Sequence, residues 1–366
     1  MTKAAELAKM GEVLTNNQIG GRRNMIINGG MNVFQRSTSA TDLGASSGYF
    51  SADRFKIFSS TSGRVTMSQS SDTPNGFGNS LKIDVTTADT SIASDELFIL
   101  SYAMEGQDAQ MIKKGTSEAE SLTMSFYAKA NASANYVVEM YDQDNTRNNT
   151  QAFTVTDSWQ RFSFTFAPDT TGALDDDNAL SFYPIQIWLH GGSNYSSGTF
   201  ASNTWGSVTN ANRYAGSRTS IFDSTDREFY VTGVQVEVGS QATPFEHRSF
   251  GEELSLCQRY YQVVPKYTFF NGAVEVSTNS LRGGVPITRP LRASPTIGNI
   301  TLIVYDDDDT SFSNAAHAVF ANSGSYEVDG TTGFLSVVFN GNLSGRTDNH
   351  NVTALYGTDG TLDSEL

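Results

Sequence analysis

The sequence between Arg22 and Arg248 is a succession of short runs in which apolar and polar residues alternate, and this period constrains the fold more than any other feature. The clearest run is Trp159-Gln160-Arg161-Phe162-Ser163-Phe164-Thr165-Phe166, which separates aromatic from polar side chains on the two faces of a strand. Turns rich in Gly, Asn, Ser and Asp separate the runs, and no helical period lies between them. The pattern predicts an all-β fold, an antiparallel jelly-roll β-sandwich over residues 23–248. The other strands that we expect cover residues 24–27, 31–35, 55–58, 65–67, 80–85, 122–128, 136–140, 185–189 and 229–238.

The sequence on either side of this β region predicts three further parts. Residues 1–22 begin with a short helical segment in which Ala4, Leu7, Gly11 and Leu14 form one apolar seam. A seam this narrow needs a partner, so we expect an attachment segment, with packing on the downstream domain as the alternative. Residues 249–264 predict a linker helix, because Ser249 and Glu252 form a capping box. Residues 265–366 return to β-type runs and predict a smaller C-terminal β-sandwich.

Charge and cysteine content exclude several classes of function. The chain has 24 Lys and Arg against 39 Asp and Glu, a formal charge of −15, which disfavours nucleic acid and anionic lipid as partners. We expect no membrane insertion, because no run approaches about 18 apolar residues. Cys257 is the only cysteine and cannot form an internal disulfide. With no leader pattern visible, we expect synthesis in a reducing cytoplasm.

No catalytic or cofactor motif stands out. The histidines His190, His247, His317 and His350 lack metal-ligand spacing, so we do not expect zinc, and we expect no enzyme. Carboxylates for glycoside hydrolysis would come from different strands, and the ones to inspect are Glu105, Glu139, Asp142 and Asp144. The acidic runs 175–177 and 306–309 lack a calcium-loop pattern, which favours solvated turns.

A long Gly-, Ser- and Asn-rich stretch from His190 to Ser220 is the best candidate for a binding site. Loops of this length in a compact domain are usually functional, and aromatic rings stack on sugar faces. The alternative is that the same rings are ordinary core residues or subunit contacts. The aromatic residues that bracket the stretch, and that we predict to bind carbohydrate, are Tyr183, Trp188, Tyr195, Trp205 and Tyr214. We expect Trp159, outside this stretch, to lie in the core.

Several segments resemble virion proteins of marine bacteriophages of the tail-fibre type. They are residues 4–14, 18–24 and 27–31 near the start, 157–162 in the body, and 233–239, 242–246, 248–254 and 257–261 after it. The body looks like a carbohydrate-binding jelly roll within a fibre protein. The end of the chain, through Leu362-Asp363-Ser364-Glu365-Leu366, is similar to fibre tip domains.

The resemblance implies a structural virion component, made in the host cytoplasm and released by lysis. It would be a homotrimer that contacts other virion proteins through its N-terminal segment and host surface glycans through its β domains. Sugar-binding modules of this fold often hold a structural Ca²⁺ near their first and last strands. Gln235 and Glu237 lie in that neighbourhood, but residues 28–31 offer no acidic partner, so a metal site stays open. A capsid-decorating head fibre, a purely structural virion protein and a polysaccharide depolymerase are the alternatives.

Overall fold

The computed structural model of the chain describes residue 3 and residues 23–265, 269–275, 280–298, 301–306, 318–321, 334–340, 351–356 and 360–366. It divides into two compact units: the first reaches to Glu253 and includes Leu366, and the second runs from Leu254 to Glu365. The seam residues Ala4, Leu7, Gly11 and Leu14 lie outside the described residues. No helix in the described part of the chain is long and apolar enough to span a membrane.

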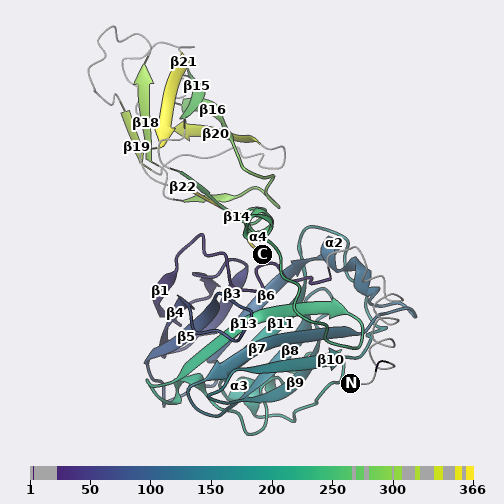
Figure 1. The fold of residues 1–366 in the computed structure, drawn as a ribbon. Helices are drawn as coiled ribbons and strands as arrows, with labels where there is room; N and C mark the ends of the chain where they lie inside the picture. The colour runs from purple at the N-terminus through teal and green to yellow at the C-terminus, as the bar shows by residue number, and fades with distance from the viewer. Residues whose placement is uncertain are drawn as a thin grey trace. The chain divides into compact units, whose positions relative to one another are not determined.

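The first unit is built from two antiparallel sheets (Figure 1). The six-stranded sheet has the order β1 (Ser39–Leu43), β4 (Arg64–Ser70), β5 (Ser80–Thr87), β13 (Glu228–Val238), β7 (Leu122–Ala130), β10 (Gln160–Phe166). The seven-stranded sheet has the order β12 (Gly206–Ser207), β9 (Arg147–Val155), β8 (Ala134–Asp142), β11 (Leu180–Gly191), β6 (Leu97–Glu105), β3 (Phe55–Ser60), β2 (Gly48–Tyr49). Neighbouring strands are mostly far apart in sequence, as in a jelly roll, and the predicted all-β fold class is confirmed.

The two sheets pack face to face around an aromatic core. Phe126 of β7 contacts Phe153 of β9 with ring centroids 5.5 Å apart, and Phe229 of β13 contacts Tyr136 of β8 at 5.7 Å. These inward residues alternate with outward ones along each strand, which is the period that the sequence shows. Trp159, which we expected in the core, lies at the surface instead. Its side chain is half-buried, and its Nε1–H donates to Asp72 at the surface, because the residue comes just before β10.

The segment before β1 is irregular, although two strands were expected there. Asn28 is buried and has φ 61°, so the backbone reverses at this residue. Its Oδ1 accepts from the backbone N–H groups of Asn32 and Val33, and its Nδ2 donates to the carbonyls of Val33 and Asp53. Side-chain hydrogen bonds therefore replace the strand ladder in this segment.

Short helices connect the strands of the first unit: α2 (Gly106–Ala109), η1 (Gln110–Ile112), α3 (Ser193–Ser196), η2 (Asn210–Asn212) and η3 (Ile221–Asp223). The helix expected over 249–264 is shorter than predicted. It is α4 (Phe250–Cys257), where Ser249 Oγ accepts from the backbone N–H of Glu252 as the capping box requires. Residues 261–264 form strand β14 (Tyr261–Val264) instead, because they pair with the chain's last strand.

The second unit is also antiparallel. β14 belongs to a three-stranded sheet with β22 (Gly360–Asp363) and β17 (Thr296–Gly298). The other sheet has the order β19 (Ala318–Ala321), β18 (Thr301–Asp306), β21 (Asn351–Tyr356), β15 (Phe269–Glu275), β16 (Ser280–Pro286), β20 (Phe334–Asn340).

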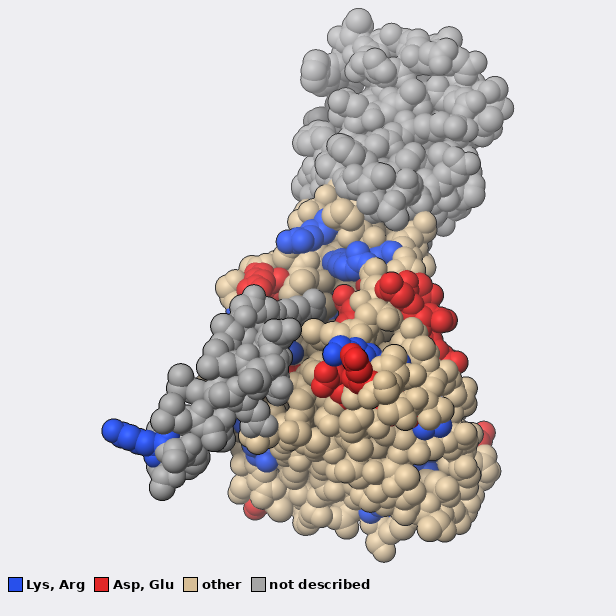
Figure 2. Space-filling model, turned by 90° about the vertical axis from the view of Figure 1, so that its right-hand side faces the viewer, with Lys and Arg blue, Asp and Glu red and all other residues tan. Residues whose placement is uncertain are grey.

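Charged residues make up only 17% of the sequence. Figure 2 shows one face, on which most of the described surface is neither acidic nor basic. The predicted solvated turn 175–177 is exposed, as expected, whereas residues 307–309 of the second acidic run lie outside the described residues.

Candidate functional site

The outer face of the seven-stranded sheet holds most of the aromatic residues that the sequence singles out. Strand register places side chains from neighbouring strands in rows across this face. One row contains Phe58, Ile99, Trp188 and Val137, and the next contains Lys56, Ser101, Gln186 and Glu139. A third row joins Tyr183 of β11, Tyr141 of β8 and Asn148 of β9, and we call it the Asn148–Tyr141–Tyr183 row.

Residues 192–220 cover the apolar row. Trp188 is 0% exposed, and its ring lies 5.4 Å from that of Tyr195 and 6.0 Å from that of Tyr214. Phe200 packs against the same cluster. The structure thus brings Trp188, Tyr195 and Tyr214 together in a hydrophobic core. Trp188 and Tyr214 are too buried to stack on a sugar, so that part of the site prediction is wrong.

The other two predicted residues lie elsewhere on the unit. Tyr183 is buried in the third row, with its ring 5.6 Å from Phe58 and stacked at 5.9 Å on Tyr141. Trp205 is partly exposed just before β12, and its Nε1–H donates to the carbonyl of Ala167 at 2.7 Å. The five residues therefore do not form one surface.

Glu139 organises the polar part of this face. It is fully buried, and its Oε2 accepts from Trp188 Nε1 at 2.7 Å. Arg213, from the covering segment, forms a forked ion pair with the same carboxylate, with Nη2 2.8 Å from Oε2. Asn148 Nδ2 donates to Oε1 at 2.6 Å. A buried carboxylate with this many donors is a fixed structural charge, because each lone pair is occupied.

The part of the outer face that remains accessible is centred on Tyr141. Its side chain is half-buried, Tyr183 supports one side of the ring, and the Arg213 guanidinium lies 5.1 Å from the ring centroid. Burial raises the pKa of Tyr141, so its hydroxyl stays protonated at neutral pH and is able to donate a hydrogen bond. Asn148 is beside it in the same row and is also half-buried. A flat ring flanked by amide and guanidinium groups suits a polyol ligand.

The carboxylates considered for hydrolysis are occupied by protein contacts. Asp142 is buried and pairs with Lys114 Nζ at 2.5 Å. Glu105 is buried and accepts from the Gln107 side chain. Asp144 is exposed and accepts from the backbone N–H of Asp175. None of these arrangements leaves a matched acid and base facing one open space.

The neighbourhood expected for Ca²⁺ is also satisfied by protein donors. Both carboxylate oxygens of buried Glu237 accept hydrogen bonds from Thr243, one from its backbone N–H and one from its hydroxyl. Gln235 Nε2 donates to Glu237 as well, and Gln235 Oε1 accepts from the backbone N–H of Glu246. The carboxylate oxygens of Glu237 and the amide oxygen of Gln235 are therefore already occupied by hydrogen bonds within the chain, and Gln235 and Glu237 do not fit a calcium site.

Comparison with known proteins gives distant likenesses only. No protein-family model and no curated protein matches the sequence. Among solved structures, a xylan-binding domain from Paenibacillus barcinonensis is 11% identical, with 61% of this chain and 100% of that chain covered and a TM-score of 0.28. A family 11 carbohydrate-binding module from Clostridium thermocellum is 14% identical, covering 57% and 100%, with a TM-score of 0.27. The enzymatically active domain of tailspike protein 4 from bacteriophage CBA120 is 11% identical, covering 59% and 21%, with a TM-score of 0.29. Likenesses this weak assign neither a family nor a ligand to the chain.

Tyr141, which is half-buried, and Arg213, whose side chain is 13% exposed, are the residues of this surface that sequence reasoning missed. Tyr141 follows directly after the expected strand 136–140, and its alternation with Val137 and Glu139 would have placed it on the outer face. Arg213 is next to Tyr214 in the long stretch, but nothing in the sequence connects it to Glu139, 74 residues earlier.

Proposed function

We propose that this chain is a non-enzymatic, glycan-binding subunit of a bacteriophage fibre or appendage, and that the Asn148–Tyr141–Tyr183 row is where it contacts sugar. The observation that carries the proposal is the half-buried Tyr141 ring, stacked on Tyr183 and flanked by Arg213. Sugar rings have apolar faces that stack on aromatic side chains and hydroxyl edges that bind amide and guanidinium donors.

Arg213 makes this surface ready for binding before a ligand arrives. Glu139 holds the guanidinium through two nitrogen atoms, and the ring of Trp188 lies 4.7 Å behind it. Little side-chain entropy remains to be lost when a sugar hydroxyl meets this group, which favours affinity. The Arg213 charge is balanced by Glu139, so the surface selects for hydrogen-bonding capacity rather than for anionic ligands.

The test is binding of the full chain to a glycan array that includes bacterial surface polysaccharides. Tyr141→Ala should weaken binding roughly tenfold, the equivalent of about 1.4 kcal/mol of lost ring contact. Tyr127→Ala is the matched control, because Tyr127 is a half-buried tyrosine on the six-stranded sheet, and it should bind as the wild type does. Equal losses in both variants, or none in either, would count against Tyr141 as the contact.

The same preparation separates the alternatives. A purely structural virion protein would bind no glycan on the array, and a depolymerase would release reducing sugar ends from a bound polysaccharide. We expect binding without release. Tail and capsid locations are distinguished by electron microscopy of phage particles labelled with an antibody against the chain, and failure to label particles contradicts a virion role.

The virion role rests on the tail-fibre-like segments described above. Residues 1–22 would attach the chain to the particle, and the β domains would meet the host. Weak sugar contacts become durable when several copies act together, which favours a parallel homotrimer. Sedimentation equilibrium of the full chain at sea-salt ionic strength should give three times the mass of one chain. A monomer at micromolar concentration would overturn the trimer and leave glycan binding unaffected.

A further inference from the structure

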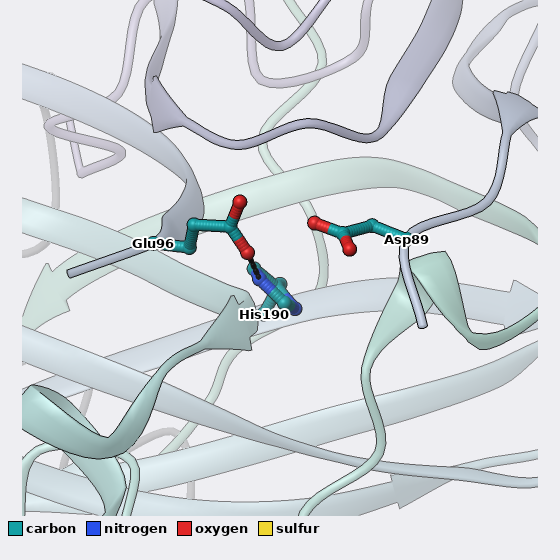
Figure 3. A group of neighbouring side chains, drawn as sticks. All are labelled: Asp89, Glu96 and His190. Carbon is teal, nitrogen blue, oxygen red and sulfur yellow. Dashed lines mark ion pairs between the residues drawn. The ribbon is translucent and has the colours of Figure 1, made fainter. Parts of the chain in front are cut away.

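A second set of polar side chains lies in the first unit, toward the end of β11 opposite to Tyr183. Asp89 follows β5, Glu96 immediately precedes β6, and His190 is near the end of β11. One ligand atom from each side chain lies within 4.8 Å of the others. Figure 3 shows the carboxylates of Asp89 and Glu96 turned toward the imidazole, with Glu96 Oε2 3.7 Å from His190 Nε2.

In the part of the chain that the structure describes, no Lys or Arg balances the two carboxylates of this cluster. Asp89 is 6% exposed and Glu96 is 7% exposed. Among the described residues, neither has a Lys or Arg partner, and their hydrogen bonds come from neutral donors such as Thr61 Oγ1 and the backbone N–H of Ser62. Buried carboxylates are normally paired with a cation or bound to a metal ion. Burial and the neighbouring Asp89 both disfavour the charged form of Glu96 and raise its pKa.

His190 presents an unused nitrogen to the same space. The side chain is 0% exposed, its Nδ1 lies 2.7 Å from Ser220 Oγ, and its Nε2 has no hydrogen-bond partner in the described part of the chain. Burial lowers the pKa of His190 to about 4, so the ring is neutral at pH 7, the form that ligates metals. Metal-binding histidines are typically held in this way, with the other ring nitrogen fixed by a hydrogen bond.

We propose that Asp89, Glu96 and His190 bind one Zn²⁺ ion. One imidazole nitrogen and two carboxylate oxygens suit zinc, whereas calcium prefers a shell made only of oxygen atoms. Ligand atoms at about 2.0–2.2 Å from a tetrahedral ion lie about 3.3–3.6 Å from one another. The Glu96–His190 separation of 3.7 Å is close to this value, and since all three ligand atoms lie within 4.8 Å of one another, the side chains would draw together when the ion binds.

An ion at this cluster would fix both ends of segment 192–220, which covers the apolar row. At the start of the segment, Gly192 N–H donates to the Glu96 carbonyl at 2.8 Å. At its end, Ser220 contacts His190, and the carbonyl of nearby Phe222 accepts from Asp89 N–H at 2.9 Å. The zinc ligands therefore come from the residues to which the segment is tied, and binding would stabilise it without a contact to any sugar.

The experiment uses the full chain, stripped with a chelator and titrated with Zn²⁺ by calorimetry. We expect one high-affinity ion per chain, a higher unfolding temperature with Zn²⁺, and slower proteolysis within residues 192–220. His190→Gln should weaken zinc binding more than about tenfold. The matched control is His247→Gln, an exposed histidine whose loss should leave zinc binding unchanged.

Three results would overturn the proposal. The first is absence of zinc binding or stabilisation in the wild type, as expected if Asp89 and Glu96 simply share a proton. The second is binding that survives His190→Gln unchanged, which means that surface groups are responsible. The third, which needs no variant to fold, is a Co²⁺-loaded wild-type chain without visible ligand-field absorption from an ordered site.

Discussion

Trp188 Nε1 donates to Glu139 Oε2 across 2.7 Å on the outer face of the seven-stranded sheet, where both residues are 0% exposed. This bond joins the apolar part of that face to its polar part. On one side of it, segment 192–220 covers Trp188, and on the other, Glu139 holds Arg213 next to Tyr141. Trp188, which the sequence suggested as a sugar contact, instead supports Glu139. Glu139 in turn positions Arg213 beside the half-buried Tyr141.

Trp188→Ala is expected to cost about 3–5 kcal/mol of unfolding free energy, because it leaves a large cavity and removes one of the hydrogen bonds to the buried Glu139 carboxylate. Chemical unfolding followed by far-UV circular dichroism measures the loss. Trp159→Ala is the matched control and should cost clearly less, since that ring is half-buried at the surface. Equal losses in the two variants would show that Trp188 is not a core residue.

Arg213→Met should destabilise the protein by about 3–5 kcal/mol, because it leaves the charge of Glu139 buried without its partner. Adding Glu139→Gln removes that charge, and the double variant should regain part of the loss. A double-mutant cycle on unfolding free energies isolates the coupling between the two residues. Losses that simply add would contradict the pairing.

Acid should weaken the cluster formed by Lys114, Arg147 and Asp169. Burial alone would raise the pKa of Asp169, but hydrogen bonds from Arg147 and Lys114 outweigh it and hold the pKa below its usual value. The unfolded chain therefore takes up this proton first as the pH falls. The stabilisation is fully present above about pH 4, the unfolded value, and is lost below it as the pH falls through the folded pKa.

The Asp169 prediction is measured as the difference between wild type and Asp169→Asn. Below pH 4 the stability curve of the variant should fall less steeply than that of the wild type, and the two curves should approach each other. Parallel curves between pH 7 and pH 2 would mean that Asp169 titrates alike in the folded and unfolded chains.

Gly29→Ala should destabilise the first unit by about 1–3 kcal/mol, because a Cβ atom there would lie 2.0 Å from the carbonyl oxygen of Val234. The backbone N–H of Val234 also donates to the Gly29 carbonyl, so the two backbone segments cannot move apart without losing a hydrogen bond. Gly78→Ala is the control, since a Cβ at Gly78 meets nothing within 4 Å. Thermal unfolding should show a lower midpoint for the first variant only.

Period-2 alternation predicts strands whose burial alternates, such as β3, β5 and β10. It also identifies β7 and β13, which are buried along most of their length, and the ends of all five strands differ from expectation by a few residues at most. It misses β6, because segment 192–220 covers its outer face and the strand is apolar on both sides. It also misses β9, where Asn148, Asn149 and Thr150 give the strand a loop-like composition.

The first expected strands fail for a related reason. The run around Asn28 alternates correctly, but the Asn28 side chain satisfies the backbone groups that a strand partner would otherwise bind. Long-range contacts decide the sites as well. No local sequence pattern connects Asp89 and Glu96 to His190 about a hundred residues later, or Glu139 to Arg213. The sequence does show that the stretch from His190 to Ser220 is rich in aromatic residues, but it does not show that several of these rings are buried.

The Asn148–Tyr141–Tyr183 row runs across strands rather than along one. Its interval is therefore the hydrogen-bonded distance between neighbouring strands, about 4.8 Å, which the backbone sets and side chains do not alter. Substitutions in such a row change the chemistry offered at each step while the step length stays constant. Single replacements during evolution could thus change which chemical groups the row presents to a ligand, while the spacing between those groups stays the same.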